Sequence, residues 1–263
     1  MLIDINSYIG HWPFRQRKYN TCATRLERMN RFGVDLSIVS NLNGVFYKNP
    51  QSANEELHHE IRSSSLFGDR FIPFAVINPA YAAWRSQFET STGDMGMKGI
   101  RLYPQYHGYE LTNTSCVELV KRSRDRGLPV AFSLRMVDSR PSSWLDLGIK
   151  KEWVLKDVVP IIRAVPDAKY LILNVANSTL VSEEDTALLK DTDLLIDTSG
   201  RNILDLSELI RTFGKDKFAF GTHAPILDDV TGLLRIESLR ADEADKVTKE
   251  LMRSGNAKRM LGL

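Results

Sequence analysis

The sequence predicts a single-domain (β/α)8 barrel, and three observations support this fold class. The chain has 263 residues, close to the roughly 250 residues that such barrels need. Short apolar segments alternate with helical patterns almost from end to end. Several of these segments are nearly continuous apolar runs, such as residues 170–173, which is typical of strands buried on both faces of a parallel sheet. An open doubly wound sheet remains the alternative, because alternation alone does not show that a sheet closes.

Eight segments have the composition of strands. Each is short, rich in Ile, Val, Leu and Phe, and bounded by Gly, Pro, Asn or Asp. They cover residues 2–9, 36–42, 71–78, 97–103, 129–135, 169–176, 193–199 and 218–224.

Helical patterns fill the intervals, with apolar residues at steps of three and four. The second opens with Ser52 and Glu55, which have the spacing of a capping box. Two further helical segments follow the eighth strand, so we expect one domain from residue 1 to 263. The expected helices are residues 24–32, 52–66, 81–90, 115–126, 152–164, 182–190, 203–213, 230–240 and 242–254.

Composition excludes several classes of function. The 35 basic and 33 acidic residues leave a net charge of +2, which favours neither nucleic acid nor a membrane surface as partner. No apolar run approaches the roughly 18 residues of a membrane helix, and no basic region precedes an apolar stretch at the start, so we expect a cytoplasmic protein. Two cysteines are too few for a disulfide framework or a thiolate zinc site. A small-molecule partner is expected, and a homo-oligomer stays open.

Polar side chains stand at the expected ends of most strands. In a barrel, catalytic groups come from the carboxyl ends of the strands and from the loops after them. We therefore expect one cluster of polar groups at the barrel mouth. Its candidate members are Asn6, Tyr8, Arg101, Tyr103, His107, Ser133, Arg135, Asn174, Asp197 and His223.

Six runs in the chain resemble the amidohydrolase-related group of the amidohydrolase superfamily. They read IDINSYIGHWPFR (3–15), KGIRLYPQYHGY (98–109), LPVAFSL (128–134), YLILNVAN (170–177), FAFGTHAP (218–225) and SGNAKRMLGL (254–263). That group includes metal-dependent decarboxylases and lactonases acting on small carboxylates. The resemblance implies the same barrel and a small, carboxylate-bearing substrate.

The metal motif of that group is where this sequence departs from it. The group has His-x-His at the end of the first strand, histidines on the fifth and sixth strands, and aspartate on the eighth. The corresponding residues here are Asn6, Tyr8, Ser133, Asn174 and His223. Neutral amide, phenol and hydroxyl groups are poor zinc ligands. We therefore expect no metal ligands at these positions and no metal-activated water.

The chemistry then moves to the remaining polar groups. His223 replaces the proton-transfer residue of the group and can act as an acid or base near neutral pH. Arg101 and Arg135 can clamp a carboxylate through bidentate hydrogen bonds. The alternative is internal pairing of these arginines with Asp4, Asp138 or Asp197.

We assign supporting roles to the other candidates. Asp197 is expected to orient His223 or to pair with an arginine. Asn6, Tyr8 and Asn174 are expected to hydrogen-bond the substrate where the resembling group holds metal. Tyr103, His107 and Ser133 are expected to line the pocket. His11 and Arg15 follow the first strand and are further mouth candidates. His58 and His59 point about 100° apart on a helix and are interpreted as ordinary helix residues.

These observations favour an amidohydrolase-like enzyme that needs no divalent metal. It would hydrolyse a small anionic substrate such as a lactone, or cleave a C–C bond by decarboxylation. A non-catalytic barrel that binds a small ligand is one alternative. The other is a hydrolase with a relocated zinc site, for which His223, His107, His11, Asp138 and Asp197 supply possible ligands without a recognisable spacing.

Overall fold

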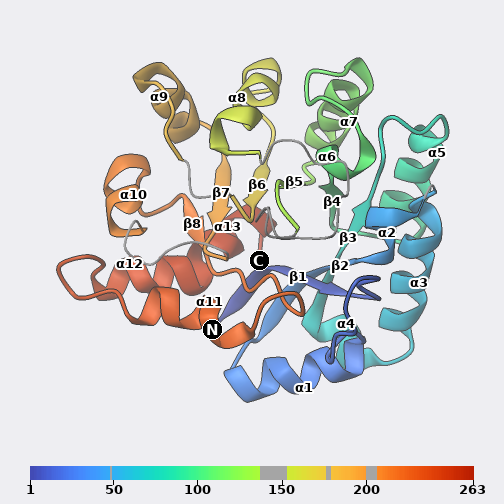
Figure 1. The fold of residues 1–263 in the computed structure, drawn as a ribbon, viewed down its shortest axis with the longest axis horizontal. Helices are drawn as coiled ribbons and strands as arrows, with labels where there is room; N and C mark the ends of the chain where they lie inside the picture. Colours follow the sequence, from blue (N-terminus) through green and yellow to red (C-terminus); the bar gives the residue numbers. More distant parts are fainter. Residues whose placement is uncertain (48, 137–152, 176–178, 200–205) are drawn as a thin grey trace.

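The computed structural model describes residues 1–47, 49–136, 153–175, 179–199 and 206–263. Its eight strands are parallel and neighbour one another in sequence order, as the sequence predicts. Figure 1 shows the strands at the centre and the helices around them. The strands are β1 (Ile3–Ile9), β2 (Leu36–Asn41), β3 (Phe71–Val76), β4 (Gly99–Leu102), β5 (Val130–Ser133), β6 (Tyr170–Leu173), β7 (Leu194–Asp197) and β8 (Phe218–Ala219).

The first and last strands meet, which decides between a barrel and an open sheet. The backbone nitrogen of Ile5 donates to the carbonyl of Phe220 at 2.9 Å, and that of Tyr8 donates to Ala224 at 2.9 Å. Residues of β1 therefore bond both to β2 and to the segment that continues β8. The fold is a (β/α)8 barrel, and the open doubly wound alternative is wrong.

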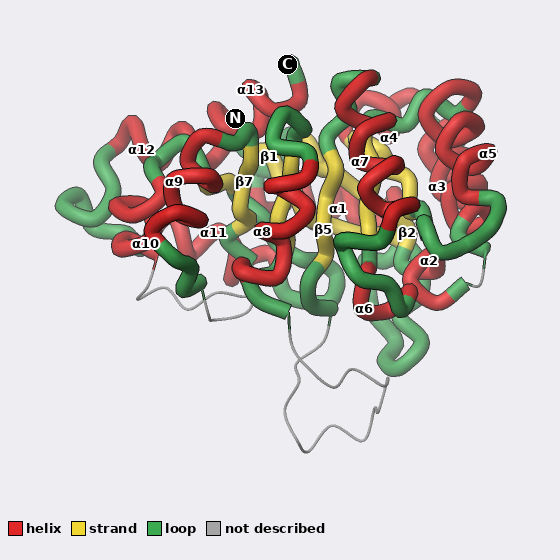
Figure 2. The backbone as a smooth tube through the Cα atoms, turned by 90° about the horizontal axis from the view of Figure 1, so that it is seen from above, coloured by secondary structure: helices red, strands yellow, loops and turns green. Residues whose placement is uncertain are grey.

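Helices flank the strands, as Figure 2 shows from above. Within the described ranges, no helix is both long and apolar enough to cross a membrane. The helices are α1 (Cys22–Phe32), α2 (Asn43–Phe46), α3 (Gln51–Arg62), α4 (Ser65–Arg70), α5 (Trp84–Glu89), α6 (Pro104–His107), α7 (Thr114–Asp125), α8 (Leu155–Ala164), α9 (Glu183–Asp191), α10 (Leu206–Phe213), α11 (Asp229–Glu237), α12 (Lys246–Glu250) and α13 (Asn256–Leu261).

One apolar cluster fills the inside of the barrel, apart from the larger cluster between strands and helices. Ile5, Phe74 and Leu171 of the inner cluster are completely buried. Gly99 of β4 faces the Phe74 ring, where a Cβ atom would lie 2.4 Å from the ring. The missing side chain of Gly99 therefore makes room for an aromatic ring at the barrel core.

Three expected elements differ from the structure. The helix over 52–66 is two helices, α3 and α4, because Ser64 is extended with φ −151° and ψ 136°. The capping box does not form, since α3 begins at Gln51, directly after Pro50. The strand over 218–224 pairs regularly only over β8, because Phe220 donates instead to the carbonyl of Met252. The helix over 242–254 begins later, at Lys246, and runs through a π-helical turn into α13.

Candidate active site

A β-bulge at the start of β1 directs two polar side chains into the barrel. The pairing with β2 shifts register between Asp4 and Ser7, and bulges re-aim the side chains of a strand. The backbone nitrogen of Asn6 leaves the ladder and donates to Asp4 Oδ1 at 2.9 Å. Asn6 and Tyr8 are two residues apart and therefore share a face of the strand. Both side chains are completely buried.

The guanidinium of Arg101, on β4, lies at the centre of the site. It is completely buried. Its Nε donates to Ser133 Oγ at 2.9 Å, its Nη1 to the carbonyl of Ser7 at 3.1 Å, and its Nη2 to Asn6 Oδ1 and to the Tyr8 hydroxyl. Its Cζ lies 3.9 Å from the centroid of the Tyr8 ring, which adds a cation–π contact. All three nitrogens thus donate to neutral oxygens of β1 and β5.

His223 follows β8 and contacts this cluster through both ring nitrogens. Nδ1 lies 3.2 Å from the Tyr8 hydroxyl, and Nε2 lies 3.4 Å from the carbonyl oxygen of Met136. Because Arg101 already donates to the Tyr8 oxygen, the Tyr8 proton is free to donate to Nδ1. The Met136 sulfur, 3.4 Å from the same hydroxyl, is the weaker acceptor. The Asn174 amide nitrogen lies 3.2 Å from the same Nε2 and would donate to it in the other tautomer, so these distances fit both neutral tautomers of the imidazole.

The electrostatics of the cluster keep His223 neutral. Burial and, to a smaller extent, the positive charge of Arg101 lower the pKa of His223 to about 3. Burial also keeps Tyr8 neutral, because it raises the pKa of the Tyr8 hydroxyl well above the usual value. At neutral pH the pair is therefore an un-ionised phenol beside a neutral imidazole.

Asp197 lies at the end of β7, and the side chain of Asn6 stands between it and His223. Its carboxylate accepts hydrogen bonds from Asn6 Nδ2 at 2.6 Å, from the backbone nitrogen of Asn174 at 2.6 Å, and from the Ser199 hydroxyl. Burial raises the pKa of Asp197, and these hydrogen bonds oppose that rise. Asn6 bridges the two groups, because its Nδ2 also lies 3.4 Å from His223 Nδ1. The role of Asp197 in orienting His223 or pairing with an arginine therefore stays a prediction, and the contact between Asp197 and His223 runs through Asn6.

Two residues of the cluster have left-handed backbones. His223 has φ 57° and Asn174 has φ 51°, a region that costs free energy for residues other than glycine. The backbone nitrogen of His223 is held by the carbonyl of Asn6 at 2.7 Å. The Asn174 amide donates to the carbonyl of Arg135 at 2.6 Å and lies 3.2 Å from His223 Nε2. Asn174 Oδ1 is buried and has no hydrogen-bond partner among the described residues.

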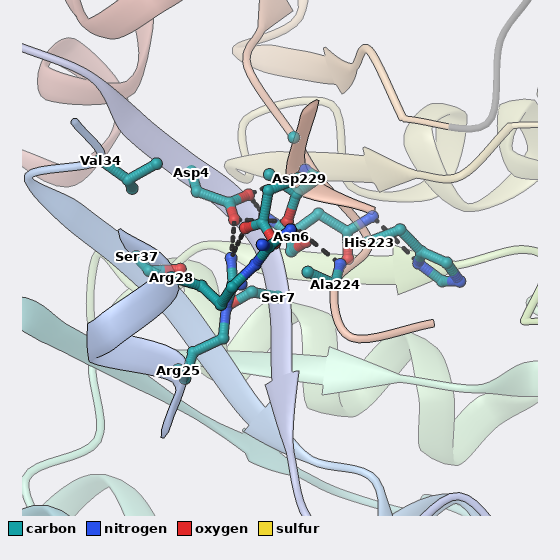
Figure 3. Close-up of polar contacts among 12 residues, drawn as sticks. Asp4, Asn6, Ser7, Arg25, Arg28, Val34, Ser37, His223, Ala224 and Asp229 are labelled. Carbon is teal, nitrogen blue, oxygen red and sulfur yellow. Dashed lines mark hydrogen bonds and ion pairs between the residues drawn. The ribbon is translucent and has the colours of Figure 1, made fainter. Parts of the chain in front are cut away.

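A buried ion-pair cluster supports both strand ends, as Figure 3 shows. Asp4 Oδ1 accepts from the backbone nitrogens of Asn6 and Thr222 at 2.9 and 3.0 Å, and Oδ2 accepts from the Thr222 hydroxyl at 2.6 Å. Arg25 of α1 lies 3.4 Å from Asp4 and 2.5 Å from Asp229 of α11. Asp4 therefore ties the backbone beside Asn6 to the backbone beside His223. Asp4 is one of the three partners that the alternative reading offers for Arg101 and Arg135, and the arginine that it contacts in the structure is Arg25.

The remaining candidates lie at different distances from this centre. Tyr103 is buried, with its ring centroid 5.8 Å from the Arg101 Cζ. His107 Nε2 lies 3.1 Å from the carbonyl of Gly44 in α2, and burial lowers the pKa of His107 to about 4. His107 thus packs against α2 and the Tyr103 ring rather than against His223.

Four further residues from the sequence analysis lie outside the cluster around Arg101 and His223. His11 and Arg15 are exposed, and the backbone nitrogen of His11 donates to Asn43 at 3.1 Å. His58 and His59 lie on α3, as expected for ordinary helix residues. Asp138 falls outside the described residues.

Comparison with known proteins supports the fold. The sequence matches no protein-family model and no curated protein. Solved structures are similar over nearly the whole chain. A dihydroxybenzoic acid decarboxylase from Polaromonas sp. JS666, with bound manganese and 2-nitroresorcinol, matches at TM-score 0.75 and 14% identity, covering 100% of this chain and 97% of that one.

Two further structures agree with it. A 5-carboxyvanillate decarboxylase from Sphingomonas paucimobilis matches at TM-score 0.74 and 13% identity, covering 100% of this chain and 99% of that one. A protein described as amidohydrolase II matches at TM-score 0.73 and 12% identity, covering 100% of both chains. This chain has their fold. These structural neighbours are two decarboxylases and a protein described as an amidohydrolase.

The bound manganese of the Polaromonas structure raises the question whether this cluster fits a divalent ion. The described residues contain no group of three His, Cys, Asp or Glu side chains placed to hold a metal. Asn6 Oδ1 and the Tyr8 oxygen already accept hydrogen bonds from Arg101. A second cation at these oxygens would lie beside the guanidinium and be repelled by it. The described residues of this cluster do not fit a divalent metal.

Proposed function

We propose that the protein is an enzyme that acts on a small carboxylate at the cluster of Arg101, His223 and Tyr8, without a divalent metal. The reaction is decarboxylation or the hydrolysis of an ester such as a lactone. One observation carries the proposal. A completely buried guanidinium, whose acceptors among the described residues are all neutral, lies next to a neutral histidine at the strand ends where barrels place their active sites.

The charge of this cluster favours an anionic substrate. Among the described residues, none of the acceptors that Arg101 contacts is a carboxylate, so no described carboxylate cancels its positive charge by direct contact. A buried charge of this kind creates a positive potential that draws anions toward the barrel mouth. The unpartnered Asn174 Oδ1 offers an acceptor for a hydroxyl or protonated group of the substrate.

His223 and Tyr8 supply a route for a proton. The unprotonated imidazole accepts a proton, and the phenol hydrogen-bonded to it donates one. An anion bound beside His223 raises the pKa of the imidazole toward neutrality, because the charged form gains a partner. The left-handed backbone of His223 holds the ring in place, and strained backbones of this kind gather at active sites.

The structural neighbours agree with this reaction class. The similar structures include decarboxylases of 2,6-dihydroxybenzoate and of 5-carboxyvanillate, which are small aromatic carboxylates. At 13% identity they support the fold of this chain, and the choice of reaction rests on the cluster itself.

A substrate panel with one variant and one control tests the proposal. Small lactones and aromatic carboxylates are assayed for acid or CO2 release with the wild type, His223→Gln and His59→Gln. We expect turnover by the wild type and by His59→Gln, and a loss of kcat of about 100-fold or more in His223→Gln. Equal turnover in His223→Gln would refute the role of His223. Ligand-dependent stabilisation without turnover on any compound would favour a binding protein instead.

A further inference from the structure

We infer that the Arg101 guanidinium is a permanent cation of the reaction centre, held where the resembling group places its metal ligands. The sequence resemblance implies that five positions of this chain correspond to those ligands: Asn6, Tyr8, Ser133, Asn174 and His223. The guanidinium donates to three of them, Asn6, Tyr8 and Ser133. Its role in catalysis rests on the proposed function, whereas its exclusion of a metal does not.

The acceptors around Arg101 are those that a guanidinium needs. A metal of this kind takes imidazole nitrogens and carboxylates, which carry the lone pairs and the charge that the ion requires. A guanidinium instead needs oxygen acceptors arranged around its plane. The amide of Asn6, the phenol of Tyr8, the hydroxyl of Ser133 and the carbonyl of Ser7 provide such oxygens. The changes at three ligand positions and the placement of Arg101 thus form one consistent arrangement.

The surrounding bonds hold the guanidinium rigidly. Its donors reach β1 and β5 from β4, so three strands would have to move for the cation to leave. The Tyr8 ring lies against its face at 3.9 Å. A cation fixed in this way stabilises negative charge on a substrate without reorganising during the reaction. It supplies charge but binds no water as a Lewis acid would, so any proton transfer falls to the Tyr8 and His223 pair.

Metal binding tests the first half of the inference without any assay of turnover. Wild-type protein is dialysed against Zn²⁺ or Mn²⁺ and then analysed for metal content and melting temperature. We expect no stoichiometric metal and no metal-dependent rise in the melting temperature. A stoichiometric ion in the wild type that Asn6→Ala removes would overturn the inference. Because turnover is not measured, this result is independent of whether the proposed function holds.

Anion binding tests the second half. Benzoate serves as the probe, and its affinity is measured calorimetrically for the wild type, Arg101→Met, Arg101→Lys and the surface control Arg85→Met. We expect Arg101→Met to weaken binding by about tenfold or more, since a nearby unit charge is lost. Arg101→Lys keeps the charge and should restore most of the affinity, and Arg85→Met should match the wild type.

Three outcomes would overturn this half. They are no benzoate binding by the wild type, equal affinity in Arg101→Met, and a loss in Arg101→Lys as large as that in Arg101→Met. If Arg101→Met does not fold, the comparison of the wild type with Arg101→Lys and the metal measurement still decide. A protein that binds benzoate through Arg101 but turns over no substrate would refute the proposed function and leave this inference standing.

Discussion

Replacing His223 with glutamine should make the protein less sensitive to acid. In the folded protein burial lowers the pKa of His223 to about 3, from a usual value of 6.5. Below pH 6.5 the unfolded chain therefore binds a proton on this residue that the folded chain does not. The chain takes up that proton when it unfolds. The contribution of His223 to the free energy of unfolding is therefore fully present above about pH 6.5 and falls as the pH drops toward the folded pKa. Integrated from about pH 7 to about pH 4, the loss due to His223 is about 3 kcal/mol.

Urea unfolding followed by circular dichroism measures this difference at a series of pH values. His107, whose pKa burial lowers to about 4, titrates over the same range in both proteins and cancels in the comparison. We expect the free energy of unfolding of His223→Gln to fall by about 3 kcal/mol less than that of the wild type over this interval. His59→Gln, on the exposed side of α3, controls for the loss of an imidazole. Parallel pH profiles for the wild type and His223→Gln would refute the buried, neutral state of His223.

Three further predictions concern the scaffold. Asp4→Ala leaves the buried Arg25 without one of its carboxylates and should cost about 3 kcal/mol of unfolding free energy in urea; a cost below about 1 kcal/mol would contradict the support role of Asp4. Gly99→Ala places a Cβ atom 2.4 Å from the Phe74 ring and should cost about 1–3 kcal/mol by the same assay. Combining it with Phe74→Leu should cost less than the sum of the two changes, and strict additivity would contradict this contact. Burial raises the pKa of the Cys116 thiol to about 12, so a thiol reagent should label Cys116 only after unfolding, and rapid labelling of the folded protein would contradict its burial.

The periodicity of the sequence predicts most of the fold. Parallel strands buried on both faces are continuous apolar runs, and helices between them carry apolar residues at three- and four-residue steps. Closure of the sheet could not be predicted this way, because it depends on hydrogen bonds between Ile5 and Phe220, which are far apart in the chain. The break between α3 and α4 was also missed, since it depends on the extended backbone of Ser64 and not on a breaker residue.

The position of polar residues at the carboxyl ends of barrel strands predicts which side chains meet, but it does not predict the hydrogen bonds between them. Asn6, Tyr8, Arg101, Ser133 and His223 meet in one network, as expected for residues at the carboxyl ends of barrel strands. Their roles in binding and catalysis stay predictions. The direction of each hydrogen bond depends on side-chain packing, and no pattern in the sequence encodes it.

The partners of the charged groups were the least predictable part of the site. Asp4 pairs with Arg25, which lies on the outer helix α1 and carries no strand-end signal. Asp4 stands between Ile3 and Ile5, which belong to the inner cluster, and the bulge between Asp4 and Ser7 breaks the alternation, so the two-residue spacing from Asn6 does not place Asp4 on the same face. Asp197 is connected to His223 through the Asn6 amide of β1, which lies within hydrogen-bond distance of both side chains.

A crystal structure of the wild-type protein grown with Mn²⁺, with diffraction measured at the manganese absorption edge, tests the central claim most directly. The account predicts the Arg101 guanidinium within hydrogen-bond distance of Asn6 and Tyr8, and no anomalous signal among the strand ends. An anomalous peak bonded to Asn6, Tyr8 or Asn174, with Arg101 displaced from them, would contradict it.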